Sequence, residues 1–184
     1  MNRTVQKTLS LGVSLVILCV LTACRNEGDY HAILALRDRI QADPNDSKAL
    51  ERLLNYLPSN HWLDPGNAAA CFRQLAESPD NKQRVVPVIA PRVVPALVKN
   101  IEHVGREATN ALTEYGDYVL PYKADLIATI QKHPHEDIAW FAAEALGNLG
   151  PNAADALPII QSMPIYETNR DLIEDAIKNI QRTR

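Results

Sequence analysis

The stretch from Asp137 to Gly150, DIAWFAAEALGNLG, decides the fold. Its apolar residues recur at the spacing of an α-helix and fall on one face, namely Ile138, Ala142, Ala145, Leu146 and Leu149. Because two of them are alanines, a neighbouring helix can approach this face closely. Gly150 suits the left-handed conformation just beyond a helix, and Pro151 cannot continue one. We therefore predict a helix that ends here and packs against similar helices.

Near-copies of this stretch lie before and after it in the chain. The motif Ala-x-x-Ala-Leu at 142–146 also occurs at 108–112, which is 34 residues earlier, and its last two residues recur as Ala-Ile at 176–177, 31 residues later. Leu-Pro pairs at 120–121 and 157–158 lie between the copies, and each is predicted to open another helix. A helix–turn–helix unit that repeats roughly every 30–40 residues is typical of an α-solenoid.

The N-terminal half is also predicted to be helical. Apolar residues at helical spacing indicate helices over about 30–41, 47–57 and 64–77. Residues 81–102 are apolar and carry prolines at 87, 91 and 95. Since proline cannot donate a hydrogen bond to a sheet, we predict a short helical turn and then a helix from Val94 to His103, rather than a strand.

These repeats resemble the short bacterial HEAT-like repeats, an armadillo-type α-solenoid family. Leu157-Pro158 with Ile160 is similar to the first helix of such a unit, and 138–150 is similar to the second. The resemblance is clear over residues 94–180, and 30–93 read as degenerate repeats. It implies that residues 30–184 form one all-α domain, a superhelix of antiparallel helix pairs.

The N-terminus has the pattern of a secretory signal. Arg3 and Lys7 precede a 13-residue apolar run over 9–21, which is shorter than the roughly 20 residues that span a bilayer. The run leads into Leu21-Thr22-Ala23-Cys24, which resembles the lipobox of bacterial lipoproteins. The resemblance implies a signal peptide over 1–23, cleavage before Cys24 and attachment of diacylglycerol to its thiol. A plain signal peptide with an incidental cysteine is the alternative.

Residues 24–29 are predicted to be a short lipidated tether. The five residues after Cys24 reach at most about 18 Å, so the helical domain would stay close to the lipid surface. The residue after Cys24 is Arg25 rather than the aspartate that would suggest inner-membrane retention. We therefore expect a lipid-anchored protein of the bacterial cell envelope, on the periplasmic face of the outer membrane if the host is Gram-negative.

Composition narrows the class of partner. The chain has 184 residues and a formal net charge of −3, and without residues 1–23 it keeps 17 basic and 22 acidic side chains. This balance offers no basic surface for nucleic acid. Of three cysteines, only Cys71 would be left unmodified, and its helical, apolar surroundings indicate a buried core residue.

The sequence contains few candidates for catalytic or metal-binding residues. Some HEAT-like proteins bind iron through His-Glu pairs in the alanine-rich helix, but Trp140-Phe141 stand at that place here. His133 and His135, in the turn before the helix, are weak candidates for metal ligands that need a third group from elsewhere. We expect no cofactor and no enzyme activity. The alternative is a metal-binding or metal-assisted enzyme site at this turn.

Binding residues are instead expected on the exposed positions of the second helices, which usually line the concave face of a solenoid. The sequence therefore predicts a non-catalytic scaffold for protein–protein interactions. Trp140 is the largest candidate, because tryptophan is common in binding hot spots, but packing between repeats is the favoured role for it. The candidate partner-binding residues are Arg106, Asn110, Glu114, Trp140, Glu144 and Asn148, with Asp171 and Asp175 beside them.

Overall fold

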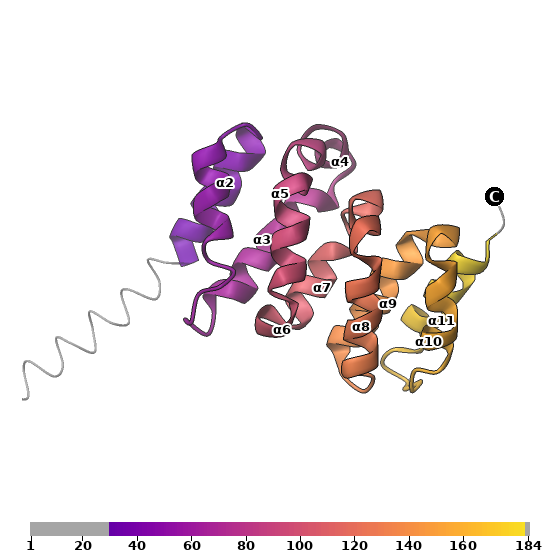
Figure 1. Cartoon of the computed structure of the whole chain (residues 1–184). Coiled ribbons are helices and arrows are strands. Elements are labelled where there is room, and N and C mark those ends of the chain that lie inside the picture. Colours follow the sequence, from indigo (N-terminus) through magenta and orange to yellow (C-terminus); the bar gives the residue numbers. More distant parts are fainter. Residues whose placement is uncertain (1–29, 183–184) are drawn as a thin grey trace, which may run out of the picture.

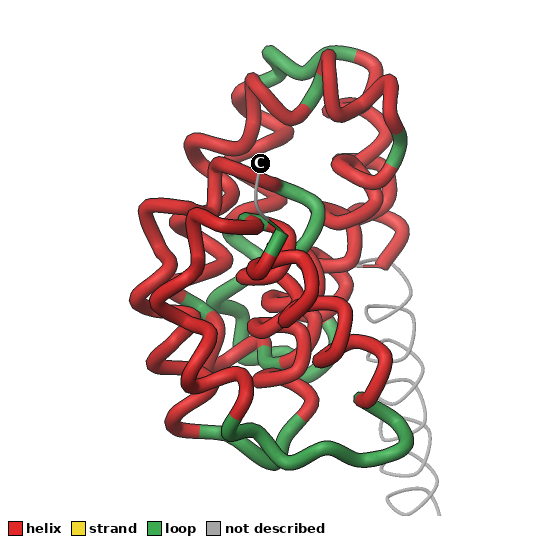
Figure 2. The backbone as a smooth tube through the Cα atoms, turned by 90° about the vertical axis from the view of Figure 1, so that its right-hand side faces the viewer, coloured by secondary structure: helices red, strands yellow, loops and turns green. Residues whose placement is uncertain are grey.

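The structure is a computed structural model that describes residues 30–182. Within that range every regular element is a helix and there is no strand, so the predicted all-α class is confirmed (Figure 2). None of the helices in this range is both long enough and apolar enough to cross a membrane. The predicted signal peptide and tether, with Cys24, lie outside the described residues.

The first two helices form a hairpin at one end of the molecule (Figure 1). Residues 30–42 are helical, and α2 (Ser47–Leu54) follows after a short turn. Asp46 caps α2, because its carboxylate accepts the backbone N–H of Ala49 at 2.9 Å and pairs with Arg39 at 2.5 Å. The helix ends three residues before the predicted Leu57, whose side chain is nevertheless buried.

The next pair is α3 (Asp64–Glu77), which has the predicted bounds, and α4 (Pro79–Arg84). Ser78 separates them, and its hydroxyl accepts the backbone N–H of Asn81 at 3.2 Å as an N-cap. The side chain of Cys71, on α3, is buried as predicted, and burial raises its thiol pKa to about 11.

The prediction for the proline-rich segment was right in type and wrong in extent. A single helix, α5, runs from Val86 to Lys99 and contains Pro91 and Pro95, so it does not begin at Val94. The prolines recur every four residues and lie on one side, where Pro87 and Pro91 are exposed. The carbonyls that lose their helical partner can therefore bond to water, which lowers the cost of internal proline.

In the C-terminal half, two helices are each followed within four residues by a glycine in the left-handed conformation. Gly116 and Gly150, which the sequence alignment places 34 residues apart, have φ values of 52° and 57°. A 3₁₀ helix begins at each of these glycines, so Pro121 lies inside a 3₁₀ helix rather than opening an α-helix. The elements are α6 (Ile101–Val104), α7 (Arg106–Leu112), η1 (Gly116–Tyr122), α8 (Lys123–Lys132), α9 (Asp137–Asn148), η2 (Gly150–Ala156), α10 (Leu157–Gln161) and α11 (Arg170–Gln181).

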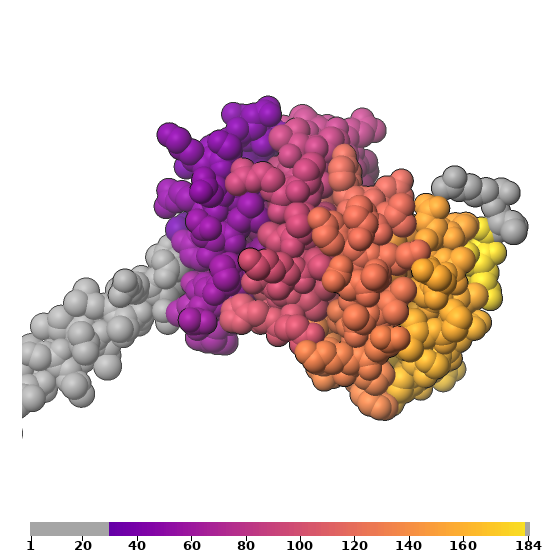
Figure 3. Space-filling model, viewed as in Figure 1, coloured from indigo at the N-terminus to yellow at the C-terminus, as the bar shows by residue number. Residues whose placement is uncertain are grey.

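Connections between helices alternate between two edges of the molecule as the chain crosses it from the indigo to the yellow end (Figures 1 and 3). We define the lower edge of Figure 1 as the connections 55–63, 100–105, 133–136 and 162–169. The upper edge comprises 43–46, 78–85, 113–122 and 149–156. Neighbouring α7, α9 and α11 pack in sequence along this direction.

The closest packing lies between α9 and α11. All five apolar residues on the predicted face of α9 are buried. A Cβ atom added to Gly147 would lie 2.6 Å from Cα of Ala176, so the two helix backbones nearly touch there. The close approach that the small-residue face predicts is therefore present.

Candidate functional site

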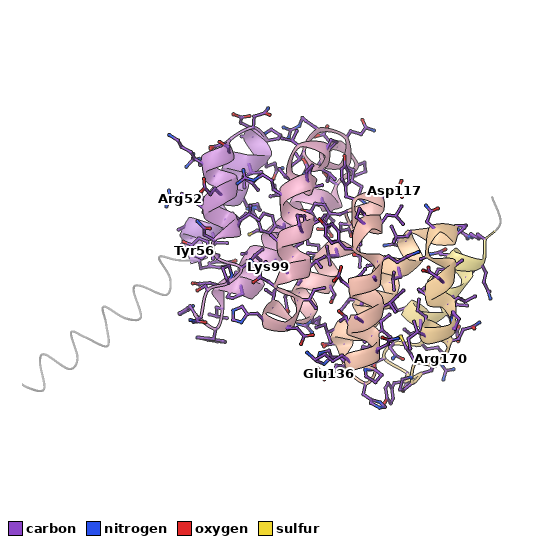
Figure 4. All side chains as sticks on the ribbon, in the orientation of Figure 1. Arg52, Tyr56, Lys99, Asp117, Glu136 and Arg170 are labelled. Carbon is purple, nitrogen blue, oxygen red and sulfur yellow. The ribbon has the colours of Figure 1, made fainter. Side chains whose placement is uncertain are left out.

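The largest concentration of predicted binding residues lies around two adjoining hollows. The first hollow, at the upper edge, has a volume of about 600 Å³. Its charged lining residues are Lys82, Glu114, Asp117 and Glu144, and Asn148 and Tyr118 also contact it. Figure 4 labels Asp117 at this edge.

The second hollow follows the surface between α9 and α11 and has a volume of about 320 Å³. It shares Glu144 and Asn148 with the first hollow and adds Asp171 and Asp175 from α11. The two hollows adjoin at these shared residues. We refer to them together as the acidic groove, defined by Lys82, Glu114, Asp117, Glu144, Asn148, Asp171 and Asp175.

Negative charge dominates the acidic groove. It carries five carboxylates and one lysine, and the ammonium group of Lys82 already pairs with Glu114 at 2.9 Å. Glu144 is half-buried and forms no ion pair with any other residue between 30 and 182. Burial, and next the charge of Glu114, raises the pKa of the Glu144 carboxyl group. The groove therefore holds an uncompensated negative potential.

Asn148 lines both hollows, and its side chain is held in place by a hydrogen bond. Its side-chain amide donates a hydrogen bond to the backbone carbonyl of Thr113 at 2.9 Å, which joins the end of α9 to the segment after α7. The Thr113 hydroxyl in turn donates to the carbonyl of Asn110 at 2.8 Å. One hydrogen bond thus ties the end of α9 to the segment after α7, and a second orders that segment locally.

Three predicted residues do not line the acidic groove. Arg106 begins α7 at the lower edge, where it pairs with Glu107 at 2.9 Å and contacts Asp137 at 3.6 Å. Asn110 is half-buried on α7. Trp140 is half-buried, packs against the core and stacks at a tilt on Tyr166, with ring centroids 6.1 Å apart. Its position is that of a packing residue between units.

The two candidate metal ligands, His133 and His135, form hydrogen bonds with different residues. The ring nitrogens of His133 lie 3.0 Å from Glu136 and 3.1 Å from Glu102, and these carboxylates, Glu136 foremost, raise its pKa. His135 bonds to the hydroxyl of Tyr166 at 3.0 Å. Among residues 30–182, no group of three or more His, Cys, Asp or Glu side chains is placed to hold a metal ion.

Sequence reasoning missed Lys82 and Asp117. Lys82 lies on α4, outside the clear repeats, and only the packing of α4 on α3 and α5 brings it to Glu114. Asp117 directly follows Gly116, the glycine that marks the end of a repeat. Its position at this boundary could have identified it as a residue beside the groove.

Comparison with known proteins does not assign the chain to a family. No protein-family model matches the chain, and no curated protein or solved structure matches it significantly.

Proposed function

We propose that this protein is a lipid-anchored scaffold without catalytic activity, whose HEAT-like superhelix binds a protein partner along the acidic groove. The observation that carries the proposal is that the two hollows adjoin, so that the acidic groove reaches from the segment after α7 across α9 to α11. Three of the six residues predicted for binding, Glu114, Glu144 and Asn148, line it. A rigid stack of helices can hold such a surface open without rearrangement.

The charge of the groove identifies the chemistry of the partner segment. Carboxylates at Asp171, Asp175 and Glu144 have no basic residue beside them in the lining of the second hollow. A segment rich in arginine or lysine complements that charge, and opposite charges also accelerate association. Cationic side chains would further favour the ionised form of Glu144, whose pKa burial raises.

The lipid anchor supplies the other part of the proposal. Acyl chains on Cys24 would confine the domain to a membrane of the cell envelope, with a five-residue tether between the anchor and Tyr30. The partner would then be a protein exposed at the same membrane. Confinement raises the effective concentration of both proteins, so a modest groove affinity suffices.

Site-specific photocrosslinking in cells tests this function. A photoreactive amino acid at Asp175, which is exposed and lines the groove, should give a discrete protein adduct. The same probe at Arg92, which is exposed on α5 and does not line the groove, should not give that adduct. Glu144→Lys in the Asp175 variant should abolish the adduct, because it reverses the central charge.

Two results would contradict the proposal. One is the absence of any specific adduct from Asp175 in membrane-bound protein of wild-type abundance. The other is the same adduct from both probe positions, insensitive to Glu144→Lys.

A further inference from the structure

Four of the eight large hydrophobic side chains that are exposed within 30–182 lie in two connections of the lower edge, whereas Tyr118 and Leu120, at 39% and 36%, lie at the upper edge. Of the large hydrophobic residues exposed within 30–182, the two most exposed are Trp62 at 79% and Ile165 at 51%. Leu63 and Tyr166 follow them in sequence and are also exposed. Each pair lies in a lower-edge connection, 55–63 or 162–169, and the two connections are at opposite ends of the molecule (Figure 1). The edge therefore offers two separated apolar contacts.

The described chain also begins on this side. Residues 30–42 lead up to the upper-edge turn at 43–46, and α2 returns from it to the connection that carries Trp62. The helix over 30–42 therefore runs toward the upper edge, and its first residue, Tyr30, is a further exposed aromatic residue. In Figure 4, Tyr56 marks the beginning of the returning connection beside the point where the described chain starts.

Hydrogen bonds hold both apolar loops in shape. His103 bonds to the carbonyl of Ser59 at 2.7 Å in the first loop. In the second, the buried Asn169 accepts the backbone N–H of Tyr166 at 2.6 Å and donates to the carbonyl of Pro164 at 3.0 Å. The exposed side chains are thus presented by ordered loops, so little ordering remains to be done on binding.

Charged groups between these loops largely neutralise one another. Glu102 pairs with Lys132 at 2.8 Å and with His133 at 3.1 Å. Arg106 pairs with Glu107 at 2.9 Å and lies 3.6 Å from Asp137. The edge therefore carries no free basic patch for anionic headgroups, and its affinity for a surface must come from the aromatic and aliphatic side chains.

We propose that the lower edge lies on the bilayer that carries the anchor, with Trp62-Leu63 and Ile165-Tyr166 seated in the lipid–water interface. Tryptophan and tyrosine favour this interface because one end of each ring is apolar and the other is polar. The inference rests on the proposed acylation of Cys24, since a tether of five residues, at most about 18 Å long, brings the domain against the lipid. The upper-edge hollow of the acidic groove then faces away from the membrane.

Fluorescence of the acylated full chain in phosphatidylcholine vesicles tests the orientation. The chain has two tryptophans, so Trp140→Phe leaves Trp62 as the single reporter. We expect its emission to shift to the blue, to be quenched by lipids brominated near the headgroup, and to lose most of its quenching by aqueous iodide. High salt should leave these effects unchanged, because paired charges contribute little to them.

A matched control places the reporter on the opposite edge. The variant Trp62→Phe, Trp140→Phe, Tyr118→Trp carries its tryptophan in η1, where the replaced tyrosine is 39% exposed. This reporter should stay open to iodide and insensitive to brominated lipid, while circular dichroism confirms that both variants are folded.

The outcomes separate the two proposals. If Cys24 is acylated and the protein floats with vesicles, but Trp62 stays as accessible to iodide as the Tyr118→Trp reporter, the lower edge does not meet the bilayer and the inference is wrong. If mass spectrometry finds Cys24 without an acyl group, the anchor fails, and the inference fails with it.

Discussion

Replacing Gly147 by alanine should lower the free energy of unfolding by about 1–3 kcal/mol, although alanine is the better helix former. The added methyl group would lie 2.6 Å from Cα and 2.8 Å from Cβ of Ala176. Both are atoms of α11 that cannot rotate away, so α9 and α11 must separate. That separation disturbs the packing of Leu146 and Ile173, which are fully buried. Urea denaturation followed by far-ultraviolet circular dichroism measures the loss.

Gly66→Ala in α3 is the matched control. Its added Cβ would meet nothing closer than Cγ of Glu107 at 3.8 Å, an ordinary contact with a flexible side chain. We expect this variant to gain roughly 0.5–1 kcal/mol from helix propensity. Equal stabilisation by both substitutions would show that α9 and α11 are not in close contact.

Tyr115→Ala should cost about 3–5 kcal/mol, the range for removing a buried aromatic side chain. Tyr115 is 2% exposed, and its hydroxyl donates a hydrogen bond to the carbonyl of Phe72 at 2.9 Å. This contact joins the end of the α7 unit to α3, 43 residues earlier. Burial raises the pKa of the phenol above its usual value, so the group stays a neutral donor.

Tyr115→Phe separates packing from hydrogen bonding. It keeps the ring and removes the donor, so we expect a cost of about 1 kcal/mol. Urea midpoints of the two variants at neutral pH give the comparison. A small loss for Tyr115→Ala would mean that the ring is not a core element between these units.

The helices could be predicted from the sequence because they depend on local patterns. The 34-residue match between 108–112 and 142–146 located two helices of the same kind, and glycines at 116 and 150 marked their ends. The extent of α5 could not be predicted, because the cost of Pro91 depends on whether its side of the helix meets water. Only the packed structure decides which side is exposed.

The candidate site was predictable in part for a similar reason. Glu114 and Asn148 lie 34 residues apart, at equivalent positions of the repeat, and Glu144 lies one helical turn before Asn148, so the pattern predicted these three on one surface. Arg106 and Trp140 also fall on second helices, but toward the lower edge and the packing between units. Lys82 and the loop carrying Trp62 lie outside the clear repeats, where no pattern assigns a residue to a face.

The claim on which both the scaffold and the membrane-facing edge depend is the acylation of Cys24. Mass spectrometry of the N-terminal peptide, from protein purified out of the membrane fraction, tests it directly. We predict that the mature chain begins at Cys24 and carries diacylglycerol on its thiol, and that the uncleaved precursor accumulates when globomycin blocks the lipoprotein signal peptidase. A mature chain that begins elsewhere, or an unmodified Cys24 in membrane-bound protein insensitive to globomycin, would contradict the account.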